Sequence, residues 1–121
     1  MENEKLVLSL CLPTNGISEW VFPVLESIYS QNVDESKYEV IVTDNGTNDD
    51  FCNRMNEYVR RHKNLLYKKT TAYQFFNQLE ALKLAHGEYL KFINHRAVLK
   101  SGALQQMIEF ILSLIHISEP T

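Results

Sequence analysis

The chain of 121 residues has little cysteine, glycine and proline, and it has no block of like charge. Its 2 cysteines, Cys11 and Cys52, form no CxxC pair and have no histidine at zinc-ligand spacing, which excludes a disulfide scaffold and a zinc finger. The net charge of −3 argues against a nucleic-acid or anionic-membrane partner. These absences leave one domain of ordinary composition, large enough to bury a core without disulfides or a metal.

Targeting signals and long apolar runs are absent as well. Residues 1–5 are too acidic for a signal peptide, and no apolar run approaches the length of a membrane span. Free thiols suit a reducing compartment. We therefore expect a cytoplasmic location for this piece, with association to a membrane left open for the full-length protein.

Four short apolar runs alternate with segments that carry an apolar stripe at helical spacing. Strands are expected at residues 6–12, 38–43, 65–68 and 89–93, each followed by a helix. The first helix is capped by Ser18, the third covers about residues 75–85 with Gly87 as its stop, and the last is capped by Ser101. Alternation with short connections predicts an α/β fold, a Rossmann-like parallel sheet with helices on its faces. The helix residues expected to face the core are Val21, Leu25, Ile28, Tyr29, Phe51, Met55, Tyr58, Val59, Phe75, Leu79, Leu82, Leu84, Leu104, Met107, Ile108 and Ile111.

Ligands of such sheets bind beyond the carboxyl ends of the strands, where three polar loops of this chain should meet. The first strand is not followed by GxxxxGK[ST] or GxGxxG, which excludes P-loop and ordinary dinucleotide sites. The remaining polar groups are hydroxyls, amides, one carboxylate, an imidazole and a guanidinium. They belong to Pro13, Thr14 and Asn15 after the first strand, Asp44 and Asn45 after the second, and Asn94, His95 and Arg96 after the fourth.

Two of these loops also have a plainer interpretation. Residues 44–50 are typical of a turn that caps the next helix. His95 and Arg96 are compatible with a solvated surface pair, because no Ser or Cys nucleophile is placed for His95 to activate. The guanidinium of Arg96 nevertheless offers the forked donors that suit a diphosphate.

Residues 8–15, 38–49 and 85–93, with Asn77 ahead of the last segment, resemble the nucleotide-binding half of family 2 glycosyltransferases with the GT-A fold. The resemblance covers about residues 5–111 and implies a GT-A sheet that is incomplete at about four β-α units. It implies transfer of a sugar from a nucleotide-diphosphate sugar to a glycan or lipid-linked acceptor, in glycan or cell-surface polysaccharide synthesis. The family's loops that hold the nucleoside match Pro13, Thr14 and Asn15 together with the pair Asp44 and Asn45.

The end of the fourth strand departs from the family. There the family has a DxD run that binds Mg²⁺ or Mn²⁺, whereas this chain has Asn94, His95 and Arg96. Hard cations prefer anionic oxygens, so an amide and a guanidinium disfavour a metal, and no metal ligand is assigned. We hypothesise that Arg96, beside Asn94 in the donor site, supplies positive charge near the diphosphate instead.

The same departure supports an alternative function, a non-catalytic GT-A-like module that binds a nucleotide sugar without transferring it. A receiver-like signalling domain ranks last, because no paired acidic cluster follows the first strand. In the family the general base follows the fourth-strand motif, so no catalytic residue is assigned here. We expect the fragment itself to be inactive, with an exposed sheet edge.

Residues 112–121 have two interpretations. In the first, the last helix continues and frays before Pro120. In the second, the segment is translated adapter DNA, because the reverse translation CTG TCT CTT ATA CAC ATC TCC GAG CCC ACG matches the mosaic end of a transposon-based sequencing library. We expect residues 1–111 to be the N-terminal part of a GT-A domain and residues 112–121 to be non-native, which the encoding DNA would test.

Overall fold

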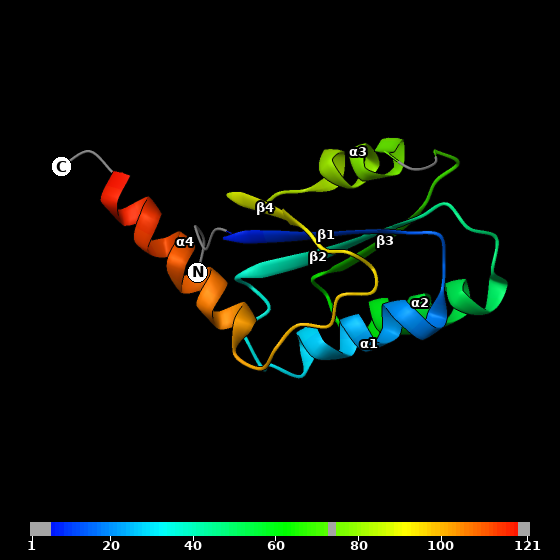
Figure 1. Ribbon diagram of the computed structural model, residues 1–121, viewed down its shortest axis with the longest axis horizontal. Helices are drawn as coiled ribbons and strands as arrows, with labels where there is room; N and C mark the ends of the chain where they lie inside the picture. The colour runs from blue at the N-terminus through cyan, green and yellow to red at the C-terminus, as the bar shows by residue number, and fades with distance from the viewer. Residues whose placement is uncertain (1–5, 73–74, 119–121) are drawn as a thin grey trace.

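The computed structural model describes residues 6–72 and 75–118, in which four strands alternate with four helices. The strands are all parallel and lie in the order β3-β2-β1-β4 (Figure 1). The predicted parallel α/β sheet is confirmed. The elements in chain order are β1 (Leu8–Thr14), α1 (Ser18–Tyr29), β2 (Tyr38–Asp44), α2 (Asp49–Arg61), β3 (Leu65–Lys69), α3 (Phe75–Leu84), β4 (Tyr89–Phe92) and α4 (Ala103–Ser118).

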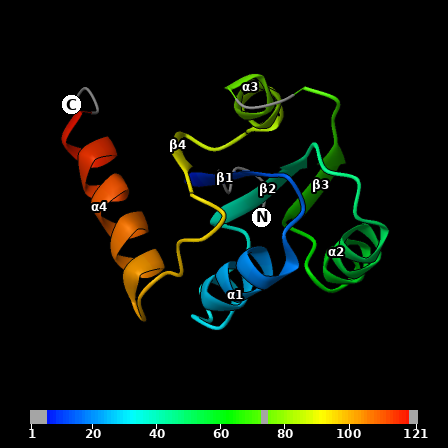
Figure 2. The same cartoon turned by 45° about the vertical axis from the view of Figure 1, so that its right-hand side comes forward.

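Different helices cover the two faces of the sheet. Figure 2 shows α1 and α2 on one side and α3 on the other. Successive side chains of a strand point to opposite faces, so β1 contributes to two cores. Leu10 and Leu12 join the main core with residues of α1, α2 and α4, while Cys11 packs with Ile41 and Ala81 on the α3 side. Helices on both faces, as predicted, are thereby confirmed.

The first strand lies later in the chain than expected and includes Pro13. In a parallel sheet the N–H and C=O of one residue point toward the same neighbouring strand. The carbonyl of Cys11 points toward β4, because it accepts a hydrogen bond from the amide of Ile93 over 2.8 Å. Pro13, two residues on, faces the same side, where β4 has already ended at Phe92. The missing N–H of proline therefore removes no ladder hydrogen bond, and the strand continues to Thr14.

Two of the expected helix caps are wrong. Ser18 is the first residue of α1, behind Ile17, and no side chain caps that end. At the start of α4 the amide of Leu104 donates over 2.9 Å to Oε1 of Gln31, so the partner comes from the connection after α1 rather than from Ser101. A long-range contact thus replaces the local one that the sequence suggests.

Helix α3 covers its face of the sheet with small and polar residues. Ala81 is fully buried and Asn77 is 3% exposed, whereas Leu82, expected inward, is 40% exposed. The side chain of Phe75, also expected inward, lies outside the described residues. Because Ala81 occupies the contact with β1 and β2, α3 approaches the sheet closely and leaves Leu82 on the outer side.

The connection from α3 to β4 is fixed by a buried carboxylate. Glu39 of β2 accepts from the hydroxyl of Ser9 at 2.6 Å and from the amide of His86 at 2.5 Å. The amide of Gly87 donates to the same serine oxygen over 2.8 Å. A Cβ on Gly87 would lie 2.8 Å from the carbonyl carbon of Leu8, so only glycine permits this approach. These contacts set β4 beside β1.

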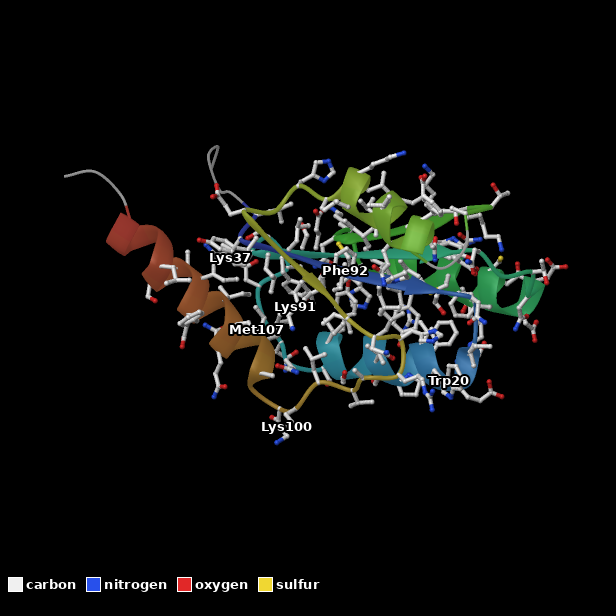
Figure 3. The ribbon with its side chains drawn as sticks, turned by 45° about the horizontal axis from the view of Figure 1, so that its top comes forward. Trp20, Lys37, Lys91, Phe92, Lys100 and Met107 are labelled. Carbon is white, nitrogen blue, oxygen red and sulfur yellow. The ribbon has the colours of Figure 1, made fainter. Side chains whose placement is uncertain are left out.

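Strand β4 forms an open edge of the sheet. All of its residues are exposed, with Leu90 at 43% and Phe92 at 44%. A groove of about 530 Å³ between β4 and α4 is lined by Phe92 and Met107, which Figure 3 labels on the two elements. Apolar side chains on an unpaired edge favour association with another strand.

Helix α4 runs without a break through residues 112–118, and residues 119–121 of the expected tail lie outside the described part. Its residues Leu104, Ile108 and Ile111 are buried, as the apolar spacing predicted. Among the described helices, none has the length and apolar character needed to cross a bilayer.

Candidate functional site

The three predicted polar loops meet at the carboxyl ends of β1, β2 and β4. The strand order reverses at β1, because the chain passes from β1 to β2 on one side and returns later to β4 on the other. Ligands of open α/β sheets bind at such a reversal. A cavity of about 540 Å³ lies there. Its lining consists of Pro13, Thr14, Asn15, Trp20, Asn45, Asn77, Gln78 and His95.

The loops after β1 and β2 cross at very short range. The amide of Asn45 donates to the carbonyl of Thr14 over 3.1 Å. A Cβ on Gly46 would lie 1.9 Å from the carbonyl oxygen of Asn15, a distance that no side chain tolerates. Glycine at this position therefore permits the crossing that brings Asn15 and Asn45 to one cavity.

Asn77 of α3 ties together the ends of three strands. Its side-chain amide donates to the carbonyls of Thr14 at 3.3 Å and Thr43 at 3.0 Å. Its Oδ1 accepts from the hydroxyl of Thr70, which follows β3, over 2.8 Å. The residue is 3% exposed, yet it lines the cavity. We infer that Asn77 positions the cavity wall.

Asp44 lies beneath the cavity rather than in its lining. Its side chain is fully buried, and it accepts from the amide of Gly46 at 2.8 Å and from the hydroxyl of Tyr67 at 2.6 Å. Lys69 forms an ion pair with it at 3.4 Å. Burial and the bond to Asp44 raise the pKa of Tyr67, which therefore keeps its donating proton. The carboxylate organises the turn after β2.

Asn45, the neighbour of Asp44, faces the cavity. Its Nδ2 donates to the carbonyl of Ala72 over 2.9 Å, which leaves its Oδ1 available as an acceptor toward a ligand. The pair predicted to hold a nucleoside is therefore divided between one buried residue and one cavity residue.

His95 is the residue of the β4 loop that enters the cavity. Its Nδ1 lies 2.7 Å from Oγ1 of Thr14, and its ring meets the indole of Trp20 edge-on with centroids 5.0 Å apart. Burial and, secondarily, the positive charge of Arg96 lower the pKa of His95. The imidazole is therefore neutral at pH 7.

Asn94 and Arg96, the other two predicted residues of this loop, do not line the cavity. Asn94 is exposed beside the β4–α4 groove, and its Oδ1 accepts from the amide of Arg96 over 2.9 Å. The guanidinium of Arg96 lies 4.3 Å from the ring centroid of Trp20, a cation–π contact at the mouth of the site. Trp20 is labelled on α1 in Figure 3.

The cavity carries no charged side chain among the residues that line it. Within residues 6–72 and 75–118 no group of three or more His, Cys, Asp or Glu side chains could hold a metal ion. An amide, an imidazole and a guanidinium at positions 94–96 do not fit a hard divalent cation, which prefers carboxylate oxygens. The side chains at positions 94–96 therefore do not form the set of oxygen ligands that such a metal ion requires.

A parallel Rossmann-like sheet with a polar cavity at the point where strand order reverses defines a ligand-binding α/β fold. No family model matches the chain. In sequence it is 24% identical over 106 residues to the poly(ribitol-phosphate) beta-glucosyltransferase of Bacillus spizizenii, a match that covers 85% of this chain and 17% of that protein.

Solved structures give the fold. The chain matches Staphylococcus aureus TarS residues 1–349 with a TM-score of 0.77 and 22% identity, over 89% of this chain and 33% of that one. It matches the mannosyltransferase PcManGT from Pyrobaculum calidifontis, in complex with GDP-Man and Mn²⁺, with a TM-score of 0.73 and 20% identity. That match covers 97% of this chain and 34% of the mannosyltransferase.

These similarities confirm the predicted fold, which the chain shares with TarS and the mannosyltransferase, and the chain spans about a third or less of the length of the proteins it matches. TarS has also been solved with UDP-GlcNAc and with UDP. Residue-level prediction left out Trp20 and Gln78, which line the cavity. The sequence did carry one signal for Trp20, because the single tryptophan of the chain lies outside the apolar stripe of α1.

Proposed function

We propose that this chain is the donor-binding part of a glycosyltransferase that uses a nucleotide-diphosphate sugar. The observation that carries the proposal is the uncharged polar cavity at the reversal point of a sheet whose fold is shared with TarS and PcManGT. TarS was solved in complex with UDP-GlcNAc, and PcManGT was solved in complex with GDP-Man. Amides that both donate and accept, beside an indole, suit the base and ribose of a nucleotide.

The predicted binding residues take different parts in this proposal. Pro13, Thr14, Asn15 and Asn45 contact the nucleotide from the cavity wall. Asp44 acts through the turn that it holds, and Asn94 and Arg96 border the mouth of the site.

In the proposed reaction an acceptor hydroxyl attacks the anomeric carbon, the new glycosidic bond forms, and the bond to the departing nucleoside diphosphate breaks. The hydroxyl proton passes to a general base in the longer protein. We propose a glycan, lipid-linked or polyol-phosphate acceptor, because the Bacillus spizizenii relative is named as a glucosyltransferase of poly(ribitol phosphate). We place the reaction in the cytoplasm, where Cys11 and Cys52, both free, remain thiols.

A divalent cation is a further element of the family resemblance, and PcManGT was solved with Mn²⁺. The described residues do not fit one, so we propose donor binding without a metal. Arg96 lies at the mouth of the site, over Trp20, where its charge can attract a diphosphate.

Calorimetry of the chain with UDP-, GDP-, CDP- and dTDP-sugars tests the proposal. We expect one nucleotide to bind, and Asn45→Ala to weaken that binding about 10-fold because one cavity hydrogen bond is lost. Asn53→Ala, the same substitution at an exposed position of α2, is the matched control. Absence of binding by every donor would overturn the proposal.

A non-catalytic module that binds a nucleotide sugar is the second candidate, favoured by the residues at positions 94–96. The two functions differ in the longer protein. Release of nucleoside diphosphate in the presence of an acceptor supports the transferase, whereas saturable donor binding with no release supports the module.

A further inference from the structure

We propose that His95 is a ligand-binding residue whose Nε2–H donates to a phosphate oxygen of the bound nucleotide. The inference rests on the proposed nucleotide-binding function. It assigns one atom and one partner to His95, a residue for which the sequence also allowed a solvated surface position.

Two contacts hold the imidazole in the cavity. Oγ1 of Thr14 lies 2.7 Å from Nδ1, and Trp20 packs against the ring with centroids 5.0 Å apart. Thr14 is buried at the end of β1, and Trp20 belongs to the first turn of α1. The ring is therefore braced by two rigid elements, which reduces the side-chain entropy that ligand binding would otherwise cost.

The hydrogen bonds of Thr14 select the tautomer. Its Oγ1 already accepts from the amide of Gly16 at 3.0 Å, and its own proton needs an acceptor. Among the contacts of the described residues, Nδ1 of His95 is the acceptor within reach. The hydroxyl therefore donates to Nδ1, the ring proton resides on Nε2, and Nε2–H is the group left free for a ligand.

The charges around the ring favour an anionic partner. No carboxylate lines the cavity, and the carboxylate of Asp44 is paired with Lys69 beneath it. The guanidinium of Arg96, the next residue, lies 4.3 Å from the ring centroid of Trp20. The same indole contacts the ring of His95. Burial of the ring and, secondarily, the charge of Arg96 lower the pKa of His95, so the ring stays neutral and donates through a single N–H. The end of the cavity near Trp20 is thus the positive end, where phosphates are stabilised.

Two substitutions of His95 separate binding from bracing. The terminal amide of glutamine reaches about as far as Nε2, whereas that of asparagine reaches only as far as Nδ1. We expect His95→Gln to keep UDP affinity within about 3-fold and His95→Asn to lose about 10-fold or more, as for a hydrogen bond to a charged group. If His95 only braced Thr14, asparagine would preserve binding and glutamine would not.

Calorimetry on the whole chain provides the readout and compares UDP with uridine. If another nucleotide binds best in the donor screen, that nucleoside diphosphate is compared with its own nucleoside instead. Uridine lacks phosphate, so His95→Asn should leave its affinity unchanged. His86→Gln, an exposed histidine at the opposite end of the sheet, is the matched control and should bind UDP as the native chain does. Circular dichroism establishes that each variant is folded.

Each outcome has one meaning. If uridine and UDP weaken equally in His95→Asn, the phosphate contact is wrong although the proposed function stands. If UDP binds only when Mn²⁺ is added and is lost in EDTA, a metal occupies the site and the inference is overturned. If the native chain binds no nucleotide, the proposed function fails first and the inference with it.

Discussion

Replacing Asn77 by alanine should destabilise the protein and disturb the cavity together, because one amide joins the ends of three strands. The substitution removes two donated bonds, to the carbonyls of Thr14 and Thr43, and one accepted bond, from Thr70. At a net value of about 1 kcal/mol for each hydrogen bond, the free energy of unfolding should fall by about 3 kcal/mol. Water entering from the adjacent cavity would replace part of this loss, so we expect about 2–3 kcal/mol.

Urea denaturation followed by circular dichroism measures this change, with an unaltered m-value indicating the same surface exposed on unfolding. Gln78→Ala, the neighbouring substitution in the same cavity, is the control and should change stability by about 0.5 kcal/mol or less. Asn77→Asp keeps the volume but directs a carboxylate toward two carbonyl oxygens, so it should cost more than alanine. An alanine variant as stable as the native chain, or an aspartate variant more stable than alanine, would refute the role given to the amide.

Three further predictions follow from the site and the sheet edge. Gly46→Ala should reduce nucleotide affinity at least 10-fold and lower thermal stability, because the new Cβ would lie 1.9 Å from the carbonyl oxygen of Asn15 and the loops must separate; unchanged affinity by calorimetry would contradict this. The lowered pKa of His95 means that the unfolded chain takes up this proton more readily, so stability present at pH 7 should fall as the pH drops below about 6.5. Arg96→Ala should raise that pKa and reduce the fall, which NMR titration of the ring checks; a pKa that moves down would be inconsistent with the charge effect. Phe92→Lys should shift the chain toward monomer in sedimentation experiments, because a charge on the β4 edge opposes strand pairing, and unchanged association would exclude that edge.

Much of the fold was predictable because the apolar pattern of this chain has a clear period. The stripe on α2, with Phe51 and Met55 fully buried, is an example. Prediction failed where long-range contacts replaced local ones. Gln31 provides the contact at the start of α4, and Ala81 rather than Leu82 packs on the sheet, since the closeness of α3 is set by the polar contacts of Asn77.

The site was predictable as a location but less so in detail. Strand order placed the three polar loops together, and the rule that ligands bind at the carboxyl ends of strands needs no coordinates. The burial of Asp44 could not be inferred, because its partners Tyr67 and Lys69 belong to a different strand. Which of His95 and Arg96 enters the cavity depends on their contacts with Trp20, which lies 75 or more positions earlier in the chain. The sequence around positions 95 and 96 does not show these contacts.

The contact between Thr14 and His95 spans 81 positions of the chain, and this separation has a consequence for folding. During synthesis β1, β2 and β3 can pair while β4 is still unmade, because β1 and β2 are sequential neighbours in the sheet. The cavity closes only when β4 docks on the free edge of β1, an event delayed by the entropy of closing the longest loop in the sheet. A ligand that binds only the docked state would stabilise β4 in its place beside β1.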